Sequence, residues 1–126
     1  MRELMIASRP HYLAVLQDVG LSPVQGMALL HLEPGEPLTM SELAVALKCD
    51  NSNVTGIVDR LEAAGLVERR PAPHDRRVKS VVVTAHGARL RDEADRRMAV
   101  PPPAFARLGA EDARALRGIL ERLSAA

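Results

Sequence analysis

The sequence predicts a mainly α-helical protein with a small β-hairpin wing, which is the order of a winged helix-turn-helix. Three features of residues 50–84 predict this fold: an amphipathic helix, a β-hairpin directly after it, and basic residues around the loop of that hairpin. Gly65 stands where the helix is expected to stop, and the hairpin strands are the β-branched runs 67–70 and 78–83. The apolar residues of the helix recur at i, i+3, i+4 and i+7, as Val54, Ile57, Val58 and Leu61.

The first two helices are placed by proline, glycine and a capping residue. Residues 1–9 are ambiguous, and Pro10 is expected in the first turn of a short helix that Gly20 ends. Ser22 then caps a second helix, with Pro23 at its first position. The apolar positions are Tyr12, Val15, Leu16 and Val19 in the first helix, and Met27, Leu29 and Leu30 in the second.

A capping box opens the third helix, because Thr39 is followed three residues later by Glu42, and this helix is expected to run to about Leu47. Asp50 or Ser52 is expected to cap the fourth helix.

Two more helices are predicted after the hairpin. Thr84 caps the fifth, which ends before the proline triplet 101–103 and has one apolar side made by Gly87, Leu90, Ala94 and Met98. Acidic Glu111 and Asp112 suit the start of the last helix. Its apolar positions are Ala113, Leu116, Ile119, Leu120 and Leu123.

Composition limits the class of protein. The chain has 126 residues, of which 47% are hydrophobic, enough for one domain with a core. We find no apolar run long enough to span a bilayer and no signal-peptide pattern, so we expect a cytoplasmic protein that does not bind membranes. The net charge is only +1, so an argument for DNA binding has to depend on where the charges lie.

The exposed side of the fourth helix and the hairpin loop are the candidate DNA-binding surfaces. Opposite its apolar stripe the helix carries small or hydrogen-bonding residues, Ser52, Asn53, Gly56, Asp59 and Arg60, which would let it lie against base-pair edges. The loop has one acidic residue, Asp75, and is bracketed by five basic ones, Arg69, Arg70, Arg76, Arg77 and Lys79. Such a loop suits phosphates and a narrow groove, so double-stranded DNA is the expected partner.

Four segments between residues 38 and 87 carry a family resemblance: LTMSELA, SNVTGIVDRLEAAGLVERR, HDRR and VTAHG. They resemble the multiple-antibiotic-resistance-regulator (MarR) family of bacterial winged-helix transcription factors. The resemblance implies a homodimer in which the single domain, 1–126, has N- and C-terminal dimerisation helices in 1–20 and 85–126 and a DNA-binding region in 22–84. It also implies binding to a pseudo-palindromic operator, usually as a repressor, with a small-molecule effector, often an aromatic acid, that weakens the DNA complex.

The resemblance also implies roles for individual residues. Arg77 matches an arginine that enters the minor groove, Asp75 matches the residue that steadies its loop, and Arg76 is expected to reach a phosphate. Gly56 matches a position often occupied by arginine, so a guanine reader is lost here. Ser52, Asn53, Thr55 and Arg60 match positions that meet bases or phosphates, and Lys79 belongs to the basic loop.

Each assignment has a plainer alternative. Polar residues on an exposed helix face are usually only solvated, and Asp75 with Arg77 could form a surface salt bridge worth under ~1 kcal/mol. Arg60 could pair within its helix with Asp59 or Glu62. A winged-helix module that binds only proteins would have a neutralised wing, and this wing is not neutralised.

We assign no catalytic, metal or cofactor-binding residue, and expect neither an enzyme nor a cofactor. The four histidines are scattered, without a His-x-x-x-His pair, and a metal-sensing site would need ligands that only the tertiary structure brings together. Cys49 is the single cysteine, so no internal disulfide forms. It precedes the fourth helix, where a thiol switch is the alternative to a small half-buried side chain.

Two departures from the family concern the dimer and the effector. A first helix shortened at Pro10 leaves less chain to hold a partner, so we expect the dimer to depend on the last helix. Its stripe, Leu116, Ile119, Leu120 and Leu123, predicts a homodimer whose two recognition helices lie about one DNA turn apart, roughly 34 Å. Aromatic residues make up only 2% of the chain, so few rings are available to bind an aromatic effector.

Overall fold

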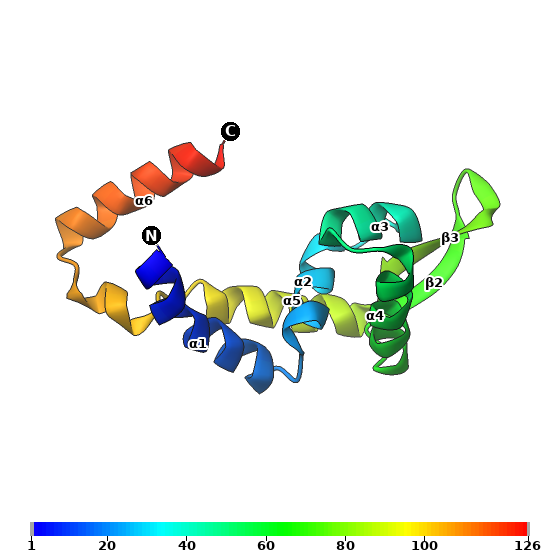
Figure 1. Cartoon of the computed structure of the whole chain (residues 1–126), viewed down its shortest axis with the longest axis horizontal. Helices are drawn as coiled ribbons and strands as arrows, with labels where there is room; N and C mark the ends of the chain where they lie inside the picture. Colours follow the sequence, from blue (N-terminus) through cyan, green and yellow to red (C-terminus); the bar gives the residue numbers. More distant parts are fainter. Residues whose placement is uncertain (1, 126) are drawn as a thin grey trace.

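The computed structural model describes residues 2–125, and its helices and small antiparallel sheet confirm the predicted fold class. The elements are α1 (Arg2–Asp18), α2 (Pro23–His31), β1 (Leu38–Thr39), α3 (Met40–Leu47), α4 (Asn51–Ala63), β2 (Val67–Ala72), β3 (Asp75–Val83), α5 (Ala85–Met98), the short 3-10 helix η1 (Pro103–Arg107) and α6 (Ala110–Ser124). The molecule is elongated (Figure 1). One end holds α3, α4 and the β2–β3 wing, and the other holds the start of α1 and α6.

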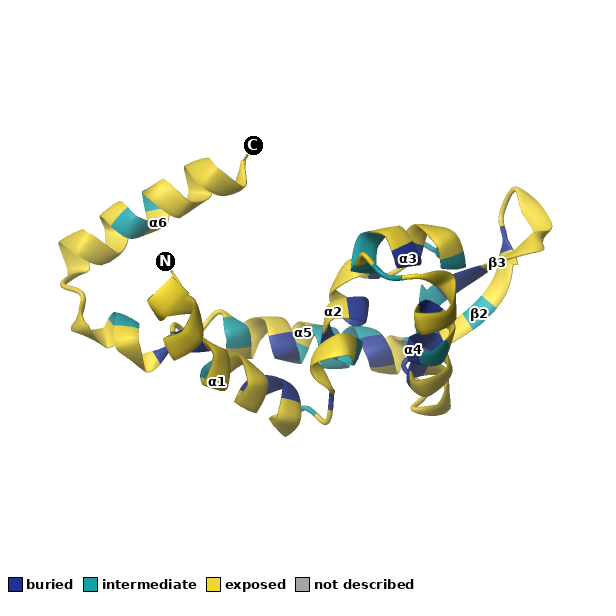
Figure 2. Cartoon of the chain, viewed as in Figure 1, coloured by how far each residue is buried: buried dark blue, intermediate teal, exposed yellow. Residues whose placement is uncertain are grey.

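The hydrophobic core lies in the winged-helix end. Leu29 of α2, Leu43 of α3, Val54 and Leu61 of α4 and Val81 of β3 are almost completely buried in one cluster. Figure 2 shows the contrast with α6, which has no buried residue among those described. The winged-helix end is therefore packed within one chain, whereas the apolar stripe of α6 is largely exposed in the part of the chain that the structure describes.

The sheet has the strand order β1-β3-β2, and both pairings are antiparallel. The hairpin was predicted, but its strands are longer than expected, so that only the turn at residues 73–74 separates β2 from β3. The short strand β1 was not predicted. Its residues Leu38 and Thr39 pair with Val81 and Ser80, and a two-residue strand is too short to show a periodic pattern.

The expectation that α1 is short and begins near Pro10 was wrong, because the helix is continuous from Arg2 to Asp18 with Pro10 inside it. Proline removes one hydrogen bond, to the carbonyl four residues earlier, and crowds that carbonyl. Here Pro10 and Ile6 are both exposed, so water can reach the Ile6 carbonyl. Burial of Val15 and Leu16 in the second half holds the helix against the rest of the chain.

The helix caps predicted at Ser22, Thr39 and Thr84 are confirmed. Thr39 and Glu42 form a reciprocal capping box at the start of α3, and Asp50, not Ser52, caps α4. Ser22 and Gln25 form a second capping box that was not predicted. The pKa of the Glu42 carboxyl lies below its usual range, because it accepts hydrogen bonds from the backbone and the side chain of Thr39.

Helix α5 connects the winged-helix end to the other end of the molecule. The Oγ1 of Thr84 accepts the N–H of Gly87 at 3.0 Å and donates to the carbonyl of Gly65 at 2.7 Å, so the start of α5 is tied to the turn after α4. Gly87 is buried against that turn. In the described part of the chain no single helix is long and apolar enough to cross a membrane, although α1 and α2, bent by 81°, would reach that length together.

Candidate nucleic-acid interface

The apolar stripe of α4 decides which of its residues face outward. Val54, Ile57, Val58 and Leu61 are buried, as predicted. Ser52, Asn53, Thr55 and Arg60 are exposed, and a Cβ at Gly56 would have nothing within 4 Å. The centre of the outward face of α4 is therefore free of side-chain bulk, and short polar side chains lie on its N-terminal side.

The N-terminus of α4 is capped by a carboxylate from its own chain. Asp50 Oδ1 accepts the backbone N–H of Asn53 and the hydroxyl of Ser52, both at 2.8 Å. These bonds hold the pKa of the Asp50 carboxyl below its usual range, with the Asn53 backbone as the main cause. The Ser52 hydroxyl would have to turn away from Asp50 to donate to a base. The side-chain amide of Asn53 makes no hydrogen bond within residues 2–125, so it is free to do so.

The other two polar candidates on α4 differ in how far they are engaged. Thr55 Oγ1 donates to the carbonyl of Asn51 at 2.9 Å, which leaves the hydroxyl able to accept. Arg60 makes no ion pair with any residue that the structure describes. The alternative that Arg60 pairs with Asp59 or Glu62 is not realised, because both carboxylates bind Arg69 of the wing strand β2.

The predicted basic patch of five residues is smaller than its sequence indicates. Arg69 lies between Asp59 and Glu62, and the Arg70 guanidinium lies 2.7 Å from the Glu68 carboxylate on the same strand. A cation that is already paired with a carboxylate of α4 or β2 contributes little to the attraction of phosphates. Of the five basic residues of this patch, the ones whose charge is available to DNA are therefore Arg76, Arg77 and Lys79, in the outer part of the wing.

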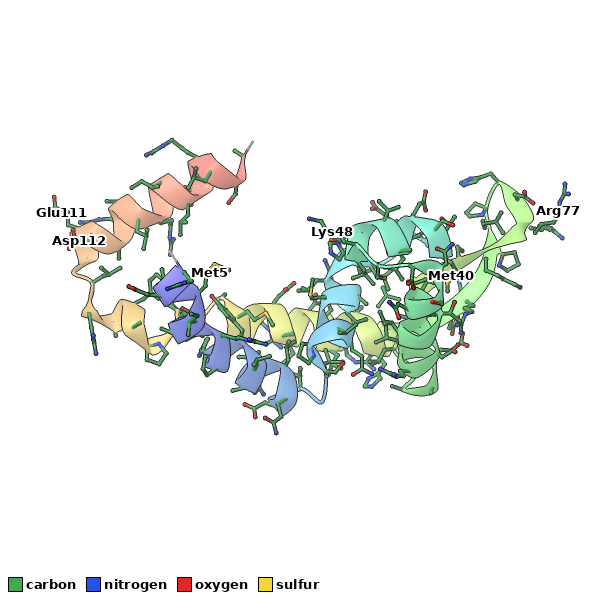
Figure 3. The ribbon with its side chains drawn as sticks, viewed as in Figure 1. Met5, Met40, Lys48, Arg77, Glu111 and Asp112 are labelled. Carbon is green, nitrogen blue, oxygen red and sulfur yellow. The ribbon has the colours of Figure 1, made fainter. Side chains whose placement is uncertain are left out.

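Asp75 stabilises the backbone at the tip of the wing. Its Oδ1 accepts the backbone N–H of Arg77 at 2.9 Å, which is the contact expected of a residue that steadies the loop. The side-chain ion pair of Asp75 with Arg77 is long, 3.7 Å, and the Arg77 side chain is 95% exposed. Figure 3 shows Arg77 at the tip of the hairpin, pointing away from the body. An exposed pair of this kind stabilises little, so it does not explain the arrangement.

Lys48 is an exposed cation that the sequence analysis did not single out. It forms the left-handed end of α3, with φ 52°, directly before the turn into α4. No sequence motif contains a lysine at this position, so the sequence did not indicate it. The left-handed backbone conformation distinguishes it only in the structure.

Cys49 lies in a groove of about 410 Å³ beside α4, together with Val24, Met27, Leu47, Ser52, Asn53, Gly56, Ile57 and Arg60. The thiol is half-buried and packs against the core, as the plainer interpretation expected. Within residues 2–125 no group of three or more His, Cys, Asp or Glu side chains is arranged to hold a metal ion.

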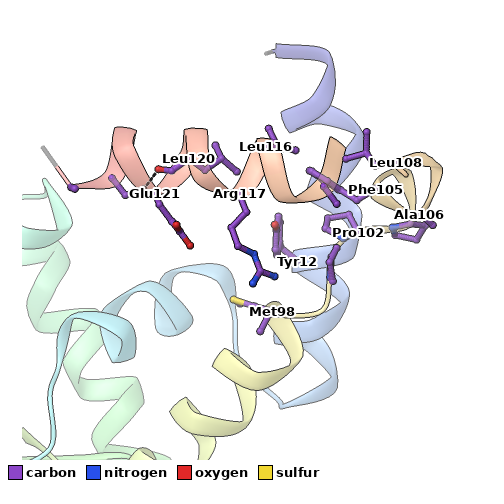
Figure 4. Close-up of a pocket in the computed structure, with 16 residues that line it drawn as sticks. Tyr12, Met98, Pro102, Phe105, Ala106, Leu108, Leu116, Arg117, Leu120 and Glu121 are labelled. Carbon is purple, nitrogen blue, oxygen red and sulfur yellow. Dashed lines mark hydrogen bonds between the residues drawn. The ribbon is translucent and has the colours of Figure 1, made fainter. Parts of the chain in front are cut away.

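A larger groove, of about 860 Å³, lies at the other end of the molecule between α1, the end of α5, η1 and α6 (Figure 4). Met98, Leu116 and Leu120 line it, and Arg117 points into it. Tyr12 and Phe105, the only Tyr and Phe of the chain, line it too. The few rings that the sequence contains are thus gathered at one place, which composition could not show.

Comparisons with known proteins identify the family. A family model described as the MarR family matches residues 19–78. A transcriptional regulator of Thermotoga maritima, Tm0710, is 32% identical; the match covers 98% of this chain and 88% of that one, with a TM-score of 0.73. This chain belongs to the MarR family.

Two further relatives of this MarR-family chain are repressors. The transcriptional repressor NicR of Pseudomonas putida is 39% identical over 75 residues, which cover 60% of this chain and 48% of NicR. The transcriptional repressor CouR, solved in complex with a 23-mer DNA duplex, is 27% identical with a TM-score of 0.72, over 98% of this chain and 87% of CouR. The chain spans about half the length of the curated relatives it matches.

Proposed function

We propose that this chain is a subunit of a homodimeric transcriptional repressor that binds a pseudo-palindromic site in double-stranded DNA. The observation that carries the proposal is the pairing, at one end of the molecule, of an α4 face without bulk at Gly56 with a wing that exposes Arg76, Arg77 and Lys79. An α-helix fits the major groove, and an arginine on a narrow wing suits the minor groove beside it. Its MarR-family relatives NicR and CouR, named as repressors, support this function.

Within this proposal, the residues have different roles. Asn53 and Ser52 read bases, Thr55 and Arg60 contact bases or phosphates, and Gly56 lets the helix backbone sit deep in the groove. In the wing, Asp75 orders the tip, Arg77 enters the minor groove, and Arg76 and Lys79 reach phosphates. The DNA-binding region is 22–84 of one domain, 1–126.

The unpartnered apolar surfaces support the homodimer. Leu120 and Ile119 are each 45% exposed and Leu123 is 68% exposed, and they lie along one helix, α6. Met5 and Ile6 of α1 are 67% and 65% exposed. Because α1 is a complete helix, its N-terminal half adds a second surface to α6, so the proposed dimer uses residues 1–20 and 85–126 together. Exposed apolar surface of this extent favours association.

The test of DNA binding compares two neighbouring wing residues. A duplex is first selected from a random pool by the parent protein, and binding is then titrated at several salt concentrations. Arg77→Ala should lose roughly 1–3 kcal/mol per half-site and weaken any preference for A·T pairs at the flanks. Arg76→Ala should weaken all DNA about equally and lower the salt slope by about one unit. If both variants bind as the parent does, the wing does not contact DNA.

A further inference from the structure

We propose that Arg69 is a positioning residue for DNA binding, which joins the recognition helix α4 to the wing and makes no contact with DNA itself. The inference rests on the proposed function, because it concerns how the two DNA-contacting elements are held relative to each other.

Arg69 binds one face of α4 at three successive turns. Its guanidinium donates to the Glu62 carboxylate at 2.9 Å, to the Asp59 carboxylate at 2.5 Å and, more weakly, to the carbonyl of Thr55 at 3.4 Å. The backbone N–H of Arg69 donates to the second oxygen of Glu62 at 2.9 Å. A single residue of β2 therefore makes four hydrogen bonds to α4, which is a rigid connection between two elements.

The same contacts withdraw Arg69 from solvent and from DNA. Its side chain is 23% exposed, against 61% for Arg70, whose ion pair is with Glu68 of its own strand. Burial lowers the pKa of the Arg69 guanidinium, but its hydrogen bonds to Asp59 and Glu62 outweigh burial and raise the pKa, so it remains charged. To reach a phosphate, Arg69 would have to leave two carboxylates unpaired beside the DNA.

The position of this connection explains why it matters for the wing. β2 leaves α4 through a tight turn at Gly65, whose φ of 73° is left-handed. Past this turn the base of the hairpin contacts α4 through β2, and α3 and α5 through β3. Its outer part projects beyond the helices (Figure 1), with Arg77 at the tip (Figure 3). A change of angle at the base of the hairpin is therefore enlarged at its tip. Base readers on α4 and Arg77 on the wing have to reach two grooves at once, which requires a fixed angle.

The test uses Arg69→Met, with Arg70→Met on the same strand as the matched control. Arg69→Met should lose at least about tenfold of the affinity for the selected duplex and little of the affinity for random duplex, with an unchanged salt slope. A phosphate contact by Arg69 would instead weaken both duplexes equally and lower the slope by about one unit. Arg70→Met should leave the ratio of the two affinities as it is in the parent. An unchanged ratio in Arg69→Met overturns the inference.

A second variant changes only the helix side of the contact. Asp59→Asn with Glu62→Gln removes two negative charges near DNA but keeps Arg69, so simple electrostatics predicts equally tighter binding to both duplexes. Positioning predicts that this double variant has a lower ratio of selected to random affinity than the parent. Arg69→Lys keeps one donor group, so its ratio should lie between those of Arg69→Met and the parent. The double variant Asp59→Asn, Glu62→Gln also tests the inference if Arg69→Met does not fold.

A third measurement needs no DNA and separates this inference from the proposed function. Spin labels on cysteines placed at Ala64 and His74, in a Cys49→Ser background and diluted with unlabelled chains, report the distance from α4 to the tip. The distance distribution should be broader in Arg69→Met than in the parent and in Arg70→Met, and identical distributions overturn the inference. If the parent selects no duplex from the pool while the distributions differ, the proposed function fails and the structural role of Arg69 stands.

Discussion

Replacement of Gly87 by alanine tests how closely α5 approaches the turn after α4. A Cβ at Gly87 would collide with the carbonyl oxygen of Leu66 and lie 2.8 Å from Val83 Cγ2. The Leu66 oxygen cannot move away freely, because it accepts the backbone N–H of Thr84 at 3.0 Å. Backbone on one side and a buried side chain on the other leave the new methyl group no room.

The magnitude follows from three contributions, of which one stabilises the variant and two destabilise it. In an open helical site, alanine is favoured over glycine by about 1 kcal/mol. Overpacking costs about 1–3 kcal/mol, and displacing the Leu66 carbonyl from Thr84 removes a hydrogen bond worth about 1 kcal/mol. We therefore expect Gly87→Ala to lower the free energy of unfolding by about 1–3 kcal/mol, the sum of these contributions.

Two other helical glycines provide controls of opposite sign. A Cβ at Gly56 would meet nothing within 4 Å, and one at Gly118 only Arg122 Nη1 at 3.7 Å. Each alanine variant should raise the free energy of unfolding by about 0.5–1 kcal/mol. Urea unfolding followed by circular dichroism measures all three, at one chain concentration because association would shift the midpoint. The reasoning is refuted if Gly87→Ala is as stable as the parent or changes in the same direction as the controls.

Four further predictions concern DNA binding by α4, the dimer interface and the cap of α4. Asn53→Ala should cost about 1–3 kcal/mol on the selected duplex and almost nothing on random DNA, and an unchanged ratio would remove its base-reading role. Gly56→Arg should bind random DNA more tightly or shift the preference toward guanine, which a second selection would reveal. Leu120→Asp should sediment as a monomer at micromolar concentration where the parent is a dimer; a dimeric variant would exclude α6 from the interface. Asp50 has a lowered pKa in the folded chain, so its contribution to stability is complete above about pH 4 and is lost as the pH falls further. Asp50→Asn, which cannot titrate, should show a smaller loss of stability in acid by urea unfolding, and an identical pH profile would contradict the role of that carboxylate.

Local signals in the sequence were sufficient for the elements whose stability is decided locally. The stripe from Val54 to Leu61 predicted both the buried face of α4 and its exposed one, because helical geometry relates the two. Thr39, Asp50 and Thr84 predicted where helices begin, since each satisfies backbone N–H groups within three residues. The roles of Asn53, Arg77 and the other candidates in DNA binding remain predictions.

Contacts between distant residues decided the rest, and no local pattern contains them. In the sequence Arg69 belongs to a basic run, but in the structure α4 places Asp59 and Glu62 against it. Helix α1 continues through Pro10 because packing of its second half and access of water to its first offset the lost hydrogen bond. The sequence alone determined where most helices begin and where the wing hairpin forms, because capping and periodicity act over a few residues. Only the tertiary structure decided the extent of α1, the pairing of β1 and which charges remain free, because these depend on contacts that folding sets.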